Sequence, residues 1–151
     1  MGSIRRPFVL MAVIAALAVL APSAALASGG SSSHGDLHVT KECSAYTHLA
    51  GGYCTITSSN IKAIPVGSRV IYLSALTNYP ILDTDIVLDP PGPGNNKAFG
   101  HVHLDLSTGS GLVTFSGGTG KFTWFHASAD VSYLGGVDWG WEGMYEFSPR
   151  D

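Results

Sequence analysis

The sequence has 151 residues and a formal net charge of −3 at pH 7, from 8 lysines and arginines against 11 aspartates and glutamates. It contains no cluster of basic residues, so its composition argues against nucleic acids and anionic membranes as partners. A chain of this length suits a single domain around one core.

The first 27 residues have the features of a cleaved secretory signal peptide. Arg5 and Arg6 precede an uncharged apolar run over residues 8–20, which is too short to span a bilayer, and an Ala-x-Ala pattern follows at residues 25–27. The pair of arginines also fits the twin-arginine route of bacterial export, with the ordinary Sec route as the alternative. We therefore expect a secreted, extracellular protein, with no membrane partner after cleavage. Without residues 1–27 its net charge is −5, because they hold two basic and no acidic residues.

The next segment, residues 28–35 (SGGSSSHG), is expected to be a flexible linker, and residues 36–151 a single domain. Cys43 and Cys54 are the only cysteines. In an exported protein an even pair is most simply a disulfide, here joining two neighbouring strands. Closing so short a loop stabilises the fold by about 3 kcal/mol.

Beyond the linker, short stretches of alternating or β-branched residues are separated by glycine turns, and no stretch shows sustained helical periodicity. The strands are expected at residues 37–41, 53–57, 69–76, 81–88, 101–106, 112–116, 121–134 and 139–147. Seven or eight such strands form an antiparallel sheet that closes or sandwiches. The fold class predicted is all-β, with a single antiparallel β-barrel of about eight strands.

The last two strands allow two registers. A two-residue turn at Gly135-Gly136 places Trp141 opposite Asp130, whereas a three-residue loop that includes Val137 places Trp141 opposite Val131. The second register makes one face wholly apolar and leaves His126, Asp130, Glu142 and Glu146 outside. Because one buried face selects the register strongly, we expect the second.

That register predicts an aromatic-lined interior, with the smaller Ala127, Ala129 and Gly143 leaving room between the rings. A barrel of eight strands can hold one small molecule, so the expected ligand site is a cavity of at least about 300 Å³. The alternative is plain core packing with no cavity. The candidate ligand-binding residues are Phe125, Tyr133, Trp139, Trp141 and Tyr145, with Phe147 beside them.

Three other patterns are weaker. The sequence GGTGK at residues 117–121 resembles a phosphate loop, but Phe122 replaces its Ser or Thr, so we expect a turn there. The pairs His101/His103 and Asp83/Asp85 each share one strand face, which admits a metal or acid–base site but is typical of a solvated face. No metal, no cofactor and no catalytic residue is assigned from the sequence.

The motifs GGTGKF (117–122), FHASADV (125–131) and WEGMYEF (141–147) together resemble the allene oxide cyclase barrel-like family, which is related to dirigent proteins. The segments at residues 53–70 and 82–88 look like secreted bacterial members. Glu142 and Met144 depart from the usual Trp-Asp-Gly-Thr-Tyr of those members. The resemblance covers most of the sequence after residue 35.

The resemblance implies an eight-stranded barrel whose apolar cavity holds a reactive small molecule in one conformation, which is then cyclised or coupled without a cofactor. No polar residue of the cyclases maps securely onto this sequence, although Glu42 lies near the first strand, where a carboxylate is expected. The hypothesis is thus a secreted barrel that binds, and as an isomerase or cyclase transforms, an apolar small molecule. The alternative is a secreted structural or interaction protein with a solid core. A homo-oligomer is compatible with both.

Overall fold

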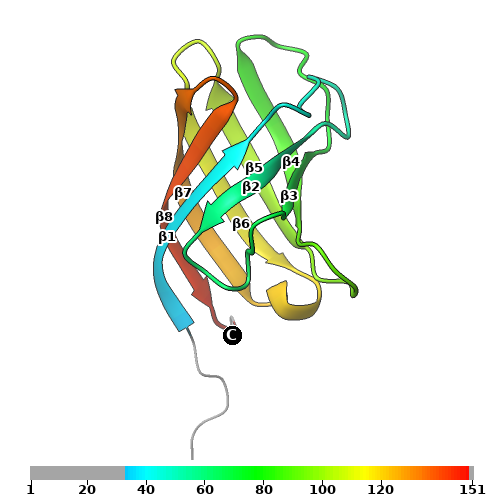
Figure 1. The fold of residues 1–151 in the computed structure, drawn as a ribbon, viewed down its shortest axis with the longest axis vertical. Coiled ribbons are helices and arrows are strands. Elements are labelled where there is room, and N and C mark those ends of the chain that lie inside the picture. The colour runs from blue at the N-terminus through cyan, green and yellow to red at the C-terminus, as the bar shows by residue number, and fades with distance from the viewer. Residues whose placement is uncertain (1–32, 150–151) are drawn as a thin grey trace, which may run out of the picture.

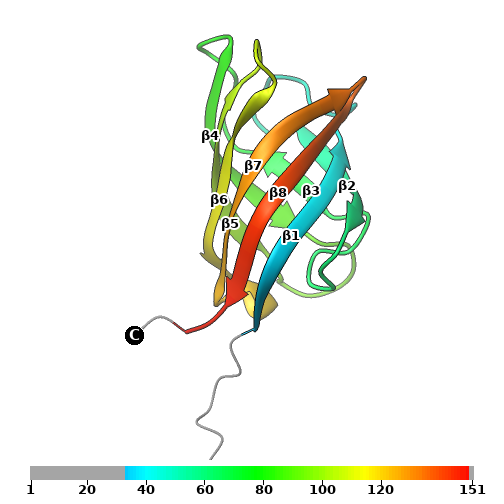
Figure 2. The same cartoon turned by 90° about the vertical axis from the view of Figure 1, so that its left-hand side faces the viewer.

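The computed structural model describes residues 33–149, which form a closed antiparallel β-barrel (Figures 1 and 2). Each strand pairs with the next along the chain, and β1 pairs with β8 to close the barrel. The expected signal peptide lies outside the described residues. The elements are β1 (Ser33–Glu42), β2 (Tyr53–Ser59), β3 (Arg69–Tyr72), β4 (Ile81–Asp89), β5 (Ala98–Asp105), β6 (Ser110–Gly118), the 3-10 helix η1 (Gly120–Phe122), β7 (Phe125–Gly135) and β8 (Asp138–Phe147).

All eight expected strands occur, and the all-β barrel is confirmed. The largest differences from the predicted boundaries, four residues each, are at the start of β1, the end of β3 and the start of β7. β1 begins at Ser33, inside the expected linker, because residues 33–35 pair with the end of β8. β3 ends at Tyr72 rather than at residue 76. β7 begins at Phe125 rather than residue 121, because residues 120–122 form η1.

The glycine-rich segment before β7 therefore forms a 3-10 helix where we expected a β-turn. Gly117 and Gly120 have φ of 113° and 56°, values that L residues with a side chain rarely adopt. The side chain of Asn96 accepts a hydrogen bond from the Lys121 backbone N–H at 2.9 Å and ties this turn to the β4–β5 loop. The turn folds Phe122 into the barrel, where it is fully buried.

The barrel has two ends, which place the site described below. At one end the disulfide Cys43–Cys54 joins the end of β1 to the start of β2. We call it the disulfide end; the loops 73–80, 106–109 and 136–137 lie there too, at the top of Figure 1. The opposite end carries η1, and we call it the η1 end (Figure 1). The expected disulfide is confirmed.

The interior is filled mainly by the inward-facing residues of each strand, as the period of two requires. Of the described residues, the largest fully buried side chains are Trp141, Phe122, Phe125, Leu37, Ile56, Ile64, Leu82, Ile86, Leu88, Val39, Val70 and Val102. No helix within residues 33–149 is long and apolar enough to cross a membrane.

The β7–β8 hairpin adopts the register that we expected from its apolar face. Trp141 lies opposite Val131, Tyr145 opposite Ala127, and Phe147 opposite Phe125. An irregularity between Tyr133 and Gly135 sets this register. Gly143 is required at its position, because a Cβ there would collide with the Ser128 carbonyl on β7.

Candidate functional site

A lysine lies inside the barrel. Leu37, Val39 and Lys41 alternate on β1 and all face inward, whereas the residues between them face outward. Lys41 is only 3% exposed. Its neighbour Glu42, which the sequence suggested as a carboxylate near the first strand, lies on the outer face and accepts hydrogen bonds from Ser44.

The amine of Lys41 contacts oxygen and aromatic rings rather than a carboxylate. Nζ donates a hydrogen bond of 2.8 Å to the Tyr72 hydroxyl. It lies 4.7 Å from the ring centroid of Trp141 and 5.4 Å from that of Tyr72. Among residues 33–149 no carboxylate forms an ion pair with it. A lysine is almost never fully buried without such a partner.

Burial in this apolar setting lowers the pKa of Lys41 to about 7, because desolvation disfavours the ammonium form. The two aromatic faces attract the ammonium form and oppose this shift. Burial also raises the pKa of Tyr72 well above its usual range, so its hydroxyl keeps its proton at neutral pH. The pair is therefore an amine that can be uncharged beside a phenol that stays neutral.

A small cavity of about 30 Å³ lies beside this amine at the disulfide end. A void of that size holds about one water molecule. Its titratable lining groups are Lys41, Tyr46 and Tyr72; the disulfide does not titrate, and the remaining lining is apolar. The lining residues are Lys41, Cys43, Tyr46, Cys54, Tyr72, Leu82, Leu104, Leu106 and Trp139.

The cavity is shallow, because Tyr46, Leu106 and Trp139 in its wall are all only half-buried. Tyr46 lies in the loop closed by the disulfide, and its ring packs 4.7 Å from that of Tyr72. Its hydroxyl is buried yet has no hydrogen-bond partner among the described residues. Movement of this side chain therefore breaks ring contacts with His48 and Tyr72 but no hydrogen bond to the described residues.

Exposed apolar side chains border the same end of the barrel. Tyr133, Leu134 and Val137 on the β7–β8 hairpin are each about half exposed. The backbone N–H of Cys43 donates to the Val137 carbonyl at 2.8 Å, which fixes this hairpin against the disulfide. An apolar surface thus adjoins the half-buried wall of the cavity.

The ligand-binding residues suggested by the sequence are divided between the two ends. Trp139 lines the cavity, and Trp141 lies under the Lys41 amine. Phe125 is buried at the η1 end against Phe122 and Phe147. The two candidate tyrosines lie elsewhere. Tyr145 is half-buried near Gly35. Tyr133 is 49% exposed, and its hydroxyl donates a hydrogen bond to the Gly136 carbonyl.

The interior differs from the expected cavity in size. We expected at least about 300 Å³ at Trp139, Trp141 and Tyr145. The interior cavity beside Trp139, whose lining includes Lys41, Leu82 and Leu104, measures about 30 Å³. A larger ligand therefore enters only if the wall moves.

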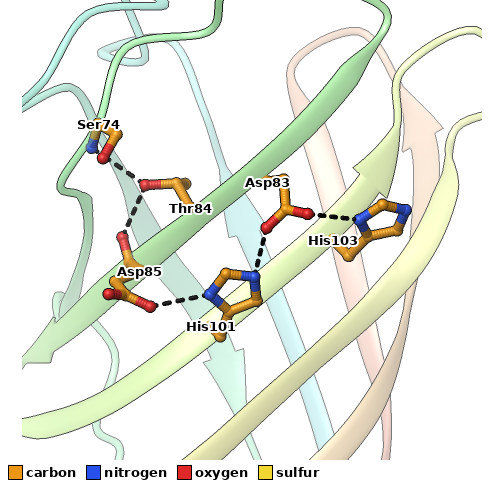
Figure 3. Close-up of polar contacts among 6 residues, drawn as sticks. All are labelled: Ser74, Asp83, Thr84, Asp85, His101 and His103. Carbon is orange, nitrogen blue, oxygen red and sulfur yellow. Dashed lines mark hydrogen bonds and ion pairs between the residues drawn. The ribbon is translucent and has the colours of Figure 1, made fainter. Parts of the chain in front are cut away.

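A second polar cluster lies on the outer face of the barrel, on the paired strands β4 and β5 (Figure 3). His101 bonds to Asp85 at 2.8 Å through one ring nitrogen and to Asp83 at 2.5 Å through the other, and His103 bonds to Asp83 at 3.0 Å. The hydrogen bond that His101 donates to the Asp85 carboxylate raises the pKa of His101. The hydrogen bond from His103 lowers the pKa of Asp83.

These carboxylates bind the imidazoles rather than a common point. Within residues 33–149 no group of three or more His, Cys, Asp or Glu is arranged to hold a metal ion. The cluster is exposed, as a solvated strand face would be. It links β4 to β5 and is not our candidate site.

A hollow of about 520 Å³ also lies over β1, β6, β7 and β8, and its lining includes Tyr145, one of the candidate ligand-binding residues from the sequence. His126 and Ser128, which face outward from β7, border it together with His34 and Glu146. His126, Asp130 and Glu142 are thus outside the barrel, as the chosen register predicts. Asp130 and Glu142 are opposite each other, and Glu142 is bonded to His38 on its other side.

Sequence reasoning missed Lys41 and Tyr72 as site residues. The alternation along each strand could have revealed them. Lys41 lies two residues after Val39 and four after Leu37, on the same strand face, and Tyr72 lies two residues after Val70. Because a lysine near the end of a strand is usually exposed, Lys41 was not predicted to face inward.

Comparison with known proteins adds little. No family model matches the sequence, and no curated protein matches it. Among solved structures, the chain is similar to a pterocarpan synthase dirigent protein, with a TM-score of 0.45 and 10% identity over 86% of this chain and 96% of that chain. A likeness this low in score and identity carries no argument, so the fold rests on the strand pairing and the site on its own geometry.

Proposed function

We propose that this protein is a secreted β-barrel that binds an apolar small molecule at its disulfide end and holds it against the Lys41 amine. The observation that carries the proposal is the burial of this amine beside a cavity without a carboxylate partner. Burying an amine is unfavourable for folding, and groups with strongly shifted pKa values gather at functional sites.

The lining supports an apolar ligand. Apart from Lys41 and the two tyrosine hydroxyls, the cavity presents leucines, the disulfide and the indole of Trp139. Exposed Tyr133 and Val137 lie on the adjoining hairpin and offer an apolar surface to an entering molecule. The ligand displaces the Tyr46 side chain, whose hydroxyl loses no hydrogen bond to the described residues on moving.

The same geometry suits a cofactor-independent isomerase or cyclase. Lys41 in its uncharged form can accept a proton, and the Tyr72 hydroxyl 2.8 Å away can donate one. A ligand held between them in one conformation would be rearranged by proton transfer. The motif resemblance to the allene oxide cyclase barrel-like family agrees with this chemistry. The disulfide agrees with export, since such bonds persist in oxidising compartments.

The alternative is a structural or interaction protein with a solid core, favoured by the small volume of the cavity. Binding of the fluorescent apolar probe N-phenyl-1-naphthylamine distinguishes the two. We expect the wild-type protein to bind the probe and Leu106→Trp, which fills the cavity, to lose at least about tenfold in affinity, or about 1.4 kcal/mol.

Leu112→Trp is the matched control, because Leu112 faces outward from β6 and is about half exposed. It should bind the probe like the wild type. Failure of the wild type to bind any probe would support the solid core, and equal binding by both variants would place the probe elsewhere.

A further inference from the structure

The amine at the disulfide end differs from the other lysines of the described residues in its surroundings. Lys62 and Lys121 are exposed, and Lys97 pairs with Asp89 at 3.0 Å. Lys41 alone among them is buried and faces a cavity. An amine that loses its proton in an apolar pocket becomes a nucleophile at neutral pH.

We propose that the Lys41 amine captures small aldehydes and ketones as an imine, so that the molecules bound at the disulfide end are carbonyl compounds. This inference rests on the proposed function, because it needs the disulfide end to admit a small molecule. It goes further by naming the chemical class of that molecule and the covalent bond that holds it.

The chemistry is balanced by the groups present. The lone pair of Lys41 Nζ attacks the carbonyl carbon, and a C–N bond forms while the carbonyl π electrons move to oxygen. The Tyr72 hydroxyl, 2.8 Å from Nζ, gives that oxygen a proton and regains one from the nitrogen. Loss of water then leaves a C=N bond; the oxygen comes from the carbonyl and both hydrogens derive from the amine.

The surroundings favour this product. Because burial raises the pKa of Tyr72 well above its usual range, its hydroxyl is protonated at neutral pH and passes a proton to the oxygen only as it takes one from the nitrogen. The ring of Trp141, 4.7 Å from Nζ, favours the positive charge of a protonated imine. The described carboxylates form no ion pair with Lys41, so none of them holds the amine in its charged state.

Access is controlled by the loop that the disulfide closes. Tyr46 covers the cavity without a hydrogen bond to hold its hydroxyl. The cavity of about 30 Å³ accommodates only a few atoms until this side chain moves. Small carbonyl compounds should therefore react first, and removal of the Tyr46 ring should speed the reaction of larger ones.

The test is reductive trapping of the full chain with propanal and sodium cyanoborohydride at pH 7, followed by intact mass measurement and peptide mapping. Lys41 should acquire one propyl group at least about tenfold faster than Lys62, because a much larger fraction of its amine is uncharged. Lys41→Met should abolish the fast phase, and Lys62→Met should retain it. The rate at Lys62 in the same sample is the internal reference for the reactivity of the reagents.

Two further variants separate the outcomes. Tyr46→Ala should raise the rate at Lys41 and leave that at Lys62 unchanged, whereas a merely surface-reactive protein would show no such difference. Modification of Lys62 before Lys41, in both the wild type and Tyr46→Ala, would overturn the inference. If the naphthylamine probe still binds in that case, the proposed function stands and only the covalent step fails.

Discussion

The two ends of the barrel interior are both rich in aromatic rings, yet they differ in polarity. At the η1 end Phe115, Phe122, Phe125 and Phe147 stack on one another with ring centroids 4.9–6.4 Å apart. At the disulfide end an amine and two tyrosine hydroxyls border a cavity. Trp141 lies between the two, in contact with Phe115 on one side and Lys41 on the other.

This difference in polarity indicates which of the two aromatic clusters is structural. A close-packed set of phenylalanines is explained by hydrophobic burial alone. A buried amine with no carboxylate partner in the described chain is not, because it opposes folding. Polar groups in the interior, rather than the density of aromatic rings, therefore mark the functional end.

The largest expected effect is loss of packing at the η1 end. Phe122→Ala should lower the free energy of unfolding by about 3–5 kcal/mol, since it removes a fully buried ring and leaves a cavity. Trp124→Ala is the control two residues away, where the side chain is about half exposed, and it should cost less than about 1 kcal/mol. Urea denaturation measures both, and similar losses would mean that η1 does not anchor this end.

Next in size is the disulfide. Reduction, or the double variant Cys43→Ala/Cys54→Ala, should destabilise the protein by about 3 kcal/mol, because the closed loop is short. It should also loosen the Tyr46 loop and raise the rate of propanal trapping at Lys41. Thermal unfolding and trapping together provide the check, and a destabilised protein with unchanged trapping would show that this loop does not limit access.

Replacing the buried amine should stabilise the protein, unlike the two changes above. Lys41→Met should raise the free energy of unfolding by about 2 kcal/mol at pH 7, because an apolar chain replaces a desolvated amine. Lys62→Met, on the surface, should change it by less than about 0.5 kcal/mol. Destabilisation by Lys41→Met would mean that the amine is structural.

The pH dependence of that gain has a defined direction. The pKa of Lys41 is lowered from 10.5 to about 7 in the folded protein, so the unfolded chain binds more protons between these values. Stability of the wild type should therefore rise as pH increases from 7 towards 10. The advantage of Lys41→Met should shrink over the same range, which denaturant titrations at several pH values would show.

The smallest effect is expected on the outer face. The pKa of His101 is raised above 6.5, so its contribution is fully present below pH 6.5 and is lost as pH rises through the raised value. Asp83 has a pKa below 3.8, so its contribution is lost as pH falls through that lower value. His101→Gln should thus be most destabilising between pH 4 and 6, by roughly 0.5 kcal/mol after solvent screening. No difference from the wild type across this range would make the cluster energetically neutral.

The sequence was enough to predict the register of the last hairpin and the disulfide, but not the buried Lys41 amine at the disulfide end. The apolar face of the last hairpin was enough to determine its register, because the alternative register would have put Asp130 on the same face as Trp141. The disulfide followed from the cysteine count. The alternation correctly placed Asp83 and Asp85 on one face of their strand, and His101 and His103 on one face of theirs.

What the sequence did not predict depends on long-range packing. Alternation along β1 places Lys41 on the same face as Leu37, but only the pairing of β1 with β8, which closes the barrel, buries that face fully. Tyr72 meets Lys41 from a strand 31 residues away, a contact that no local pattern encodes. Cavity volume is likewise a property of all eight walls, so the expected space beside Trp139 was overestimated.

A ¹³C NMR titration of the Lys41 side chain in the wild-type protein, with and without N-phenyl-1-naphthylamine, tests directly whether the disulfide end is the binding site. We predict a titration midpoint near pH 7, from burial of the amine, and a clear shift of that midpoint when the probe is bound. A midpoint near 10 that the probe leaves unchanged would contradict the claim that the disulfide end is the binding site.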